Sequence, residues 1–330
     1  MKAQVIKKFG DPFVFELVNI TKPMLKPGHV LVKVHATSVN QIDGKIRSGA
    51  VSALSPEFPA ILGCDVAGII DSIAPDVENF NIGDEVYGCA GGLRGTPGAL
   101  AEFMLADSRL LAKKPKTFSM AEAAVLPLVT ITAWEALFKK ANLTVNKNIL
   151  IHGGVGGVGH IALQLAKWCG AKVFTTVLRD EDISLAKSFG ADEVINAKEE
   201  EVEKYVTRLT HGRGFDVVFD TVGGSNLDKS LLAAAINGNV VTTVSRSTHD
   251  LTPMHNKSLS LHVVFMLLPI LTGIGCEEHG NILSKITEIA DLGKLKPLID
   301  PHSFTLEQVS EAHVLLDSGK ARGKIAISIS

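Results

Sequence analysis

The sequence predicts an α/β protein in which a doubly wound parallel sheet forms one domain and a mostly β domain forms the other. Three observations support this fold class. From about residue 148, short β-branched runs alternate with helix-like runs, as in parallel strands joined by right-handed crossovers. Residues 1–120 are instead punctuated by Gly and Pro, and their apolar runs are short and strand-like. A length of 330 residues exceeds the usual size of one core and indicates two domains.

The expected elements follow from local patterns along the chain. HVLVKVHATSV (29–39) alternates for part of its length, and NIGDEVYG (81–88) places a turn before a strand. AEAAVLPLVTITAWEAL (121–137) is rich in helix formers on both sides of Pro127, and GKIAISIS (323–330) is expected to be a strand that returns to the first domain. In the alternating region we expect strands at 148–154, 172–177, 192–195, 215–220 and 239–244, and helices at 158–169, 180–191, 199–209 and 227–236.

Composition and charge exclude several classes of partner. The net charge of −2 provides no basic field for a nucleic acid or an anionic membrane. The most apolar run (262–275) is shorter than the ~20 residues of a membrane span and is interrupted by Pro269. The start of the chain lacks the apolar stretch of a signal peptide, and the four cysteines form no C-x-x-C pair. We therefore expect a cytoplasmic protein that acts on a small molecule and has no nucleic-acid or membrane partner.

The strongest chemical signal is GGVGGVG (153–159), which lies between an expected strand and an expected amphipathic helix. Glycine permits the tight turn and lets the backbone approach a pyrophosphate, while the helix N-terminus offers free N–H groups to the phosphates. The pattern contains G-x-G-x-x-G and predicts a Rossmann dinucleotide site. The expected contacts in this loop are Gly153, Gly154, Val155, Gly156, Gly157, Val158 and Gly159.

The second strand of the alternating series indicates which dinucleotide is bound. NAD sites usually place a carboxylate ~20 residues after the loop, but here Val177 lies near that point, preceded by Thr176 and followed by Arg179. A guanidinium can bind the 2′-phosphate of NADP, so the sequence favours NADP(H) over NAD(H), with Thr176 and Arg179 as cofactor contacts. In the alternative reading, Asp180 and Glu181 solvate Arg179 or cap the next helix.

With the N-terminal motifs, these features resemble the medium-chain dehydrogenase/reductase superfamily, and within it the zinc-independent quinone and enone (2-alkenal) oxidoreductases. The resemblance covers essentially the whole chain. It implies a chaperonin-10-like, mostly β catalytic domain at 1–122 and 269–330, a Rossmann domain inserted at 123–268, and a homodimer. The matching segments are SVNQIDGKIRSG (38–49), FPAILGCDVAGII (58–70), NIGDEVYG (81–88), GALAEF (98–103), AAVLPLVTITAWEAL (123–137), IHGGVGGVG (151–159), FDVVFDTVGG (215–224) and KPLIDPHSF…ARGKIAI.

The same resemblance bears on metal binding. Zinc-dependent members place ligands at three regions, but here Asn40 takes the first position, Cys64 the second, and the third region reads PLVTIT. Asp65 follows Cys64 where the family has an acidic residue, and Cys89 alone cannot replace the four cysteines of the structural zinc lobe. A catalytic zinc needs three protein ligands and an open position. We therefore expect no metal.

Without zinc, hydrogen-bond donors must stabilise the enolate that forms when a hydride is added to a conjugated carbonyl compound. NQIDGKIRSG supplies Asn40, Lys45 and Arg47 as candidate catalytic residues. Asn-x-x-Asp-x-Lys is similar to the enone oxidoreductases, whereas many quinone oxidoreductases carry Tyr in place of Lys45. The alternative is a solvated basic face paired with Asp43.

Further cofactor contacts are carried over from the family motifs. His152, before the loop, is interpreted as a core histidine rather than a general base. The contacts implied by the resemblance are Asn40, Thr130, Val222, Gly223, Val244, Ser245, Phe265 and Met266.

The sequence thus predicts an NADPH-dependent oxidoreductase that transfers a hydride to an enone, enal or quinone without a metal. Two alternatives remain open. One is a zinc-dependent alcohol dehydrogenase. The other is a non-catalytic NADPH-binding sensor or crystallin-like protein, since a fold can outlive an activity.

Overall fold

The computed structural model describes residues 1–329, and its chain forms two compact units. One unit comprises Met1–Ile131 and Leu267–Ser330, and the other Thr132–Met266. The predicted domain boundaries, 122/123 and 268/269, lie near these divisions in the sequence. No helix in the described part of the chain is long and apolar enough to cross a membrane.

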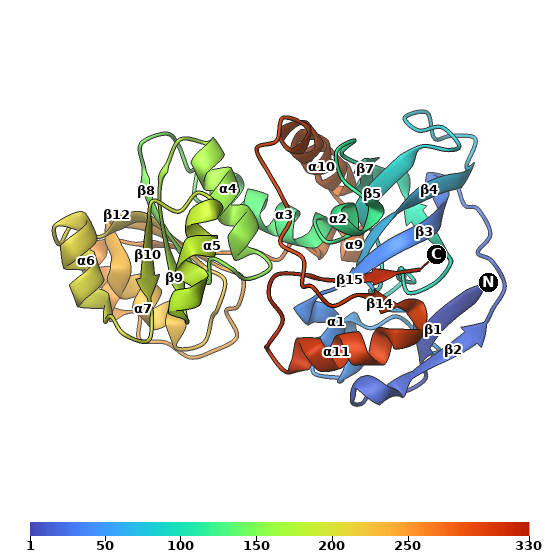
Figure 1. The fold of residues 1–330 in the computed structure, drawn as a ribbon, viewed down its shortest axis with the longest axis horizontal. Coiled ribbons are helices and arrows are strands. Elements are labelled where there is room, and N and C mark those ends of the chain that lie inside the picture. The colour runs from blue at the N-terminus through green and yellow to red at the C-terminus, as the bar shows by residue number, and fades with distance from the viewer. Residues whose placement is uncertain (330) are drawn as a thin grey trace. The chain divides into compact units, whose positions relative to one another are not determined.

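The discontinuous unit is built on a mostly antiparallel sheet (Figure 1). Within residues 1–329 its strands follow the order β14-β15-β3-β4-β5-β7, with β6 also paired to β3 and a separate β1-β2 pair. The strands are β1 (Lys2–Ile6), β2 (Phe15–Asn19), β3 (His29–Val39), β4 (Asp65–Ile73), β5 (Glu85–Cys89), β6 (Phe103–Asp107), β7 (Leu111–Lys113), β14 (Phe304–Thr305) and β15 (Ile325–Ser328). The expected strand at 323–330 therefore forms as β15, although residue 330 lies outside the described residues.

Short helices surround this sheet, and α10 is the longest of those in the described chain. Tyr87 of β5 anchors α10, because its hydroxyl donates to Leu283 O at 2.8 Å. The helices are η1 (Pro12–Val14), α1 (Gln41–Arg47), η2 (Ser52–Leu54), η3 (Ser108–Leu110), α2 (Met120–Ala124), α9 (Leu268–Thr272), α10 (Cys276–Asp291), η6 (Leu306–Gln308) and α11 (Val309–Asp317).

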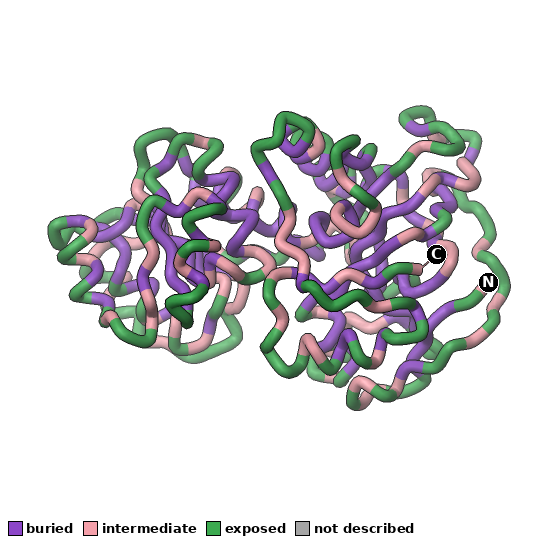
Figure 2. Tube along the Cα trace, in the orientation of Figure 1, coloured by how far each residue is buried: buried purple, intermediate pink, exposed green. Residues whose placement is uncertain are grey.

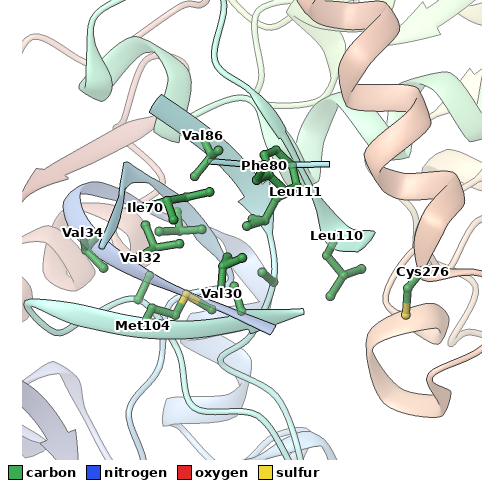
Figure 3. Close-up of a cluster of buried hydrophobic side chains, with 14 residues drawn as sticks. Val30, Val32, Val34, Ile70, Phe80, Val86, Met104, Leu110, Leu111 and Cys276 are labelled. Atoms are coloured by element: carbon green, nitrogen blue, oxygen red, sulfur yellow. The ribbon is translucent and has the colours of Figure 1, made fainter. Parts of the chain in front are cut away.

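Buried apolar side chains from several strands of this sheet form one core cluster (Figure 3). Alternate residues of β3 point into it, and β4, β5 and β6 contribute Ile70, Val86 and Met104, all almost fully buried. The predicted alternation of residues 29–39 is the cause, since successive side chains of a strand point to opposite faces. The labelled members of the cluster are Val30, Val32, Val34, Ile70, Phe80, Val86, Met104, Leu110, Leu111 and Cys276.

The second unit confirms the doubly wound prediction. Within the described chain its sheet has the order β10-β9-β8-β11-β12-β13, and every neighbouring pair is parallel. The order reverses between β8 and β11, and ligands of such sheets bind at this switch point. The strands are β8 (Asn148–His152), β9 (Lys172–Val177), β10 (Glu193–Asn196), β11 (Phe215–Asp220), β12 (Ala234–Thr242) and β13 (Ser260–Val263).

Helices flank the parallel sheet, whose strands are largely buried (Figure 2). Side chains of α6 and α7 close one core cluster over Leu150, Phe174 and Val218 of the sheet. The π-helix η4 (Glu135–Lys140) continues α3 (Pro127–Trp134), within which the division between the units falls. The other helices are α4 (Gly159–Trp168), η5 (Asp180–Asp182), α5 (Ile183–Ser188), α6 (Val202–Thr210), α7 (Asn226–Ala233) and α8 (Thr252–Lys257).

Two expected elements have different bounds in the structure. The helix expected at 227–236 ends at Ala233, and β12 begins at Ala234 rather than 239. Asn237 has φ +59°, and the register of β12 against β11 shifts between Phe215 and Val217, so an irregular start hides the strand from a pattern search. The helical stretch at 121–137 breaks before Pro127, which begins α3 because proline lacks the N–H that a continuing helix would use.

Candidate active site

The glycine loop joins β8 to α4 and requires glycine at several positions. Gly153 has φ +75°. A Cβ on Gly154 would lie 2.2 Å from Thr175 Oγ1, and one on Gly159 would lie 2.0 Å from Gly153 O. The inner side of the loop is therefore pressed against its own turn and against β9. Its outer side is open, because Gly156 is exposed.

The open side presents hydrogen-bond donors. Within residues 1–329, the backbone N–H groups of Val155, Gly157 and Val158 have no hydrogen-bond acceptor, and α4 begins at the next residue. Unpaired N–H groups at a helix N-terminus, with the positive end of the helix dipole, suit a phosphate group. The loop thus fits the pyrophosphate of a dinucleotide on its own geometry.

Two polar side chains lie beneath the loop. Thr176 Oγ1 accepts a hydrogen bond from Gly153 N at 3.2 Å and lies 3.2 Å from His152 Nδ1. Burial lowers the pKa of His152 to about 4, so the imidazole is neutral at pH 7. This agrees with the interpretation of His152 as a core residue. Thr176, predicted as a cofactor contact, supports the loop from below and is buried.

Asp220, at the end of β11, shapes the neighbouring turn. Its Oδ1 accepts hydrogen bonds from Val222 N at 2.9 Å, Gly223 N at 3.0 Å and Asn226 Nδ2 at 2.9 Å. Its Cα is paired in register with that of His152 in β8. Asp220 therefore fixes the turn that carries Val222 and Gly223, two of the predicted cofactor contacts.

The remaining predicted contacts of this unit follow the ends of parallel strands at one edge of the sheet. Gly223 has φ +74°, and a Cβ there would lie 2.4 Å from Val244 Cβ, so these two residues touch. Ser245 is exposed, Phe265 is 40% exposed and Met266 is 3% exposed. The structure thus brings Gly223 and Val244 together, while Met266 faces the interior.

Arg179 follows β9 and has carboxylate partners. Its Nε donates to Asp182 Oδ2 at 2.9 Å, and its Nη1 lies 3.3 Å from Glu181 Oε1. The contact with Glu181 is the one that the alternative reading expects, and binding of a 2′-phosphate stays a prediction. Asp182, which is buried, orients the guanidinium through Nε, and the Arg179 side chain is 47% exposed.

In the discontinuous unit, the predicted residue Asn40 lies in a buried polar cluster. Asn40 caps α1, and its N–H donates to Asp43 Oδ2 at 2.8 Å. Its Nδ2 donates to Asp65 Oδ2 at 2.9 Å and lies 3.5 Å from Ser38 Oγ. Its Oδ1 accepts a short hydrogen bond from Lys324 Nζ. Three segments distant in sequence therefore meet at one carboxamide.

Burial dominates the electrostatics of this cluster. Burial, together with the nearby charge of Asp65, raises the pKa of Asp43 to about 6. Burial also raises the pKa of Asp65 and lowers that of Lys324, while the attraction between the two opposes both shifts. The thiol of Cys64 contacts the thiol of Cys89 and the carboxyl group of Asp43. The contact with Cys89 and burial raise the pKa of Cys64 well above its ordinary value. Both cysteines therefore remain thiols at pH 7.

The other predicted residues of this unit lie in different surroundings. Lys45 is exposed on α1, whereas Arg47 is buried and donates to Asp317 Oδ2 at 2.7 Å. Asp43 forms its hydrogen bonds with Asn40 and Cys64, so it does not pair with the solvated basic face of the alternative reading, whereas the exposure of Lys45 agrees with the solvated lysine of that reading. The hydroxyl of Thr130 is buried and donates to Leu126 O, directly before its own helix α3.

Comparisons with known proteins extend over the whole chain. The family model "Alcohol dehydrogenase GroES-like domain" matches residues 26–116, and "Zinc-binding dehydrogenase" matches residues 157–268. An NADPH-dependent alkenal/one oxidoreductase of Arabidopsis thaliana is 33% identical over 99% of this chain and 79% of its own length. A quinone oxidoreductase of Homo sapiens is 31% identical over 99% of this chain and 97% of its own. The chain belongs to the medium-chain dehydrogenase/reductase superfamily. A solved alcohol dehydrogenase superfamily protein from Novosphingobium aromaticivorans has a TM-score of 0.95 and 38% identity, and each chain is covered fully.

One matching family model of this superfamily carries zinc in its name, but the donor set found here does not fit a catalytic zinc. Asn40 and Cys64 take two of the ligand positions, and the third region, PLVTIT, supplies no ligand, whereas a catalytic zinc needs three protein ligands. The ammonium of Lys324 already lies against Asn40. In residues 1–329 no group of three or more His, Cys, Asp or Glu side chains could hold a metal ion.

Sequence reasoning missed two residues that shape these sites. Asp220 ends the strand FDVVFD directly before a glycine turn, and a carboxylate in that place often accepts from the N–H groups of the turn, so a local signal existed. Lys324 has no local signal. Only the pairing of β15 with β3, in which Ile325 lies opposite Val39, brings it beside Asn40.

Proposed function

We propose that this chain is an NADPH-dependent oxidoreductase that transfers a hydride to a conjugated acceptor, an enone, enal or quinone, without a metal. The observation that carries the proposal is the donor set around Asn40. Where metal-dependent relatives need ligands, this chain has a carboxamide bonded to an ammonium and a carboxylate. The glycine loop, with its open N–H groups, supports the dinucleotide half of the proposal. The names of the alkenal/one and quinone oxidoreductase relatives support the acceptor.

NADPH, when bound, supplies the hydride. The residues of this chain bind and orient it: the glycine loop holds the pyrophosphate, and the half-exposed guanidinium of Arg179 binds the 2′-phosphate while Asp182 holds Nε. The other proposed contacts are those expected from the sequence, with Thr176 acting as support beneath the loop. These are Asn40, Thr130, Thr176, Val222, Gly223, Val244, Ser245, Phe265 and Met266.

Hydride addition to a conjugated acceptor leaves negative charge on the carbonyl oxygen, and donors must meet it. We assign this role to Asn40, through Nδ2, and to the exposed ammonium of Lys45. Removing one such donor typically slows the reaction by about 10²–10³-fold. Arg47 already forms an ion pair with Asp317, so a role at the substrate stays a prediction.

The proposal is tested with purified protein and a panel of enones, enals and 1,4-quinones, each assayed with NADPH and with NADH. We expect NADPH oxidation with at least one acceptor, unchanged by a chelator and without zinc on elemental analysis. Turnover of alcohols with near-stoichiometric zinc would establish the zinc-dependent alternative. Tight NADPH binding without turnover of any acceptor would establish the sensor.

We also propose that the protein is a cytoplasmic homodimer. The four cysteines are free thiols in the described chain, as a reducing compartment requires. Strand β13 lies at the edge of the six-stranded sheet within residues 1–329, and Val263 at its end is 43% exposed. An edge strand can pair with a second copy. Light scattering coupled to gel filtration should give twice the mass of one chain, and a monomer mass would refute the dimer.

A further inference from the structure

Lys324 is a fully buried lysine that directly precedes β15, and its contacts are specific. Its Nζ donates to Val39 O at 3.1 Å and to Asn40 Oδ1, and it lies 3.9 Å from Asp65 Oδ2. Burying an ammonium is unfavourable unless it is paired and hydrogen-bonded. Asp65 supplies the opposite charge. Charge balance alone does not require the hydrogen bond to Asn40, so this bond needs a separate explanation.

That bond selects one orientation of a carboxamide. Asn40 directs its oxygen toward the ammonium of Lys324 and its NH₂ toward the carboxylate of Asp65. Rotating the group by 180° would place NH₂ against an ammonium and oxygen against a carboxylate, and both contacts would be repulsive. A cation on one side and an anion on the other therefore hold the carboxamide in a single state.

In this fixed orientation, one hydrogen of Asn40 Nδ2 forms only a weak hydrogen bond. The first hydrogen goes to Asp65 at 2.9 Å, whereas the second has Ser38 Oγ at 3.5 Å, the limit of a hydrogen bond. Ser38 Oγ itself donates to Asp65 at 2.8 Å. Since Lys324 withdraws electron density through Oδ1, the second N–H is also a stronger donor than that of an isolated amide.

We propose that Lys324 is a positioning residue, which together with Asp65 orients and polarises Asn40 so that its second Nδ2–H meets the oxygen of the acceptor that becomes negative. This inference rests on the proposed function, because it concerns the same hydride transfer. It adds a residue from the far end of the chain to the machinery and gives Asp65 a purpose beyond balancing charge.

Lys324→Met tests the role, and Lys114→Met is a matched control. Lys114 is also a buried lysine of this unit, bonded to Pro115 O and Phe118 O and paired with Glu85. Both variants should lower the melting temperature. Only Lys324→Met should lower kcat for the enone or quinone, by about 10–100-fold as for other supporting residues, with the Kd of NADPH within about two-fold of wild type. Equal losses of kcat in the two variants would overturn the proposal.

The double variant Lys324→Met/Asp65→Asn separates positioning from charge balance. It removes both charges at once, so the melting temperature should recover while kcat stays low, because nothing then selects one orientation of Asn40. Recovery of kcat together with stability would show that Lys324 only neutralises Asp65.

A double-mutant cycle combines Lys324→Met with Asn40→Ala. In that background Lys324→Met should change kcat by less than about two-fold, since the group that it positions is gone. Additive losses would refute the proposal. A wild-type protein that reduces no acceptor would instead refute the proposed function, before any variant is compared.

Discussion

Gly159→Ala should destabilise the nucleotide-binding unit and abolish NADPH binding. The added Cβ would lie 2.0 Å from Gly153 O, 2.8 Å from Gly153 C and 3.0 Å from Gly154 Cα, all of them backbone atoms. Carbon atoms in contact prefer about 3.5–4.0 Å, so the start of α4 must move by more than 1 Å against the loop. Overpacking of this kind costs about 1–3 kcal/mol or more, and the better helix propensity of Ala offsets at most about 1 kcal/mol. We expect a loss of roughly 2 kcal/mol, which corresponds to a melting temperature roughly 5–10 °C lower.

Gly156→Ala is the control, since its Cβ would meet only Gly153 O, at 3.2 Å. Gly156 is exposed on the side of the loop that faces the proposed pyrophosphate. This variant should melt within about 2 °C of wild type and still bind NADPH at least about ten-fold more weakly, because the methyl group keeps the backbone from the phosphates. Melting is followed by circular dichroism, and binding by the fluorescence of NADPH. Wild-type melting of Gly159→Ala, or equal destabilisation by both variants, would refute the reasoning.

Three further predictions concern the cofactor, acid stability and an ion pair. Arg179→Ala should raise the Kd of NADPH selectively, measured against NADH, and equal weakening of both would exclude a 2′-phosphate contact. Burial and the charge of Arg47 lower the pKa of His313 to about 3, so below its unfolded value of about 6.5 the unfolded chain binds a proton that the native chain does not. His313 should therefore make stability fall by about 1.4 kcal/mol per pH unit from pH 6.5 downward, opposed between about pH 6 and 4 by Asp43, whose pKa is raised to about 6. Urea titrations of His313→Gln should lack the His313 slope, and an unchanged slope would contradict it. Asp317→Asn should lower the free energy of unfolding by about 1–2 kcal/mol, because it leaves Arg47 buried without its charged partner. We expect kcat to stay unchanged. A fall in kcat would instead favour a role for Arg47 at the substrate.

The parts of the fold that depend on neighbouring residues could be predicted from the sequence. The glycine loop and the alternation of strands and helices arise from backbone geometry within a few residues, and the structure contains both of them. The irregular start of β12 could not be predicted, because it depends on how the strand pairs with β11 rather than on its own pattern.

The candidate site was also only partly predictable from the sequence. Asn40 could be selected because it stands in a motif, but the sequence treats it as an isolated donor beside Lys45. The structure shows that its carboxamide is held by Asp65 and Lys324, which are distant in sequence and reach it through the pairing of β3 with β4 and β15. Likewise, nothing local distinguishes Arg47, which is buried, from Lys45, which is exposed. Long-range contacts decide both: strand pairing for Asn40, and the ion pair with Asp317 of α11 for Arg47.

The pairing of β15 with β3 has a consequence for folding during synthesis. Ribosomes release the chain from its N-terminus, so Asn40 and Asp65 emerge well before Lys324. Thr132–Met266, which form a contiguous unit, emerge in between and can fold before that. Until residues 324–328 arrive, the Asp65 carboxylate has no ammonium beside it and β3 lacks a neighbour. A nascent chain can therefore complete its nucleotide-binding unit before Asn40 acquires its contact with Lys324.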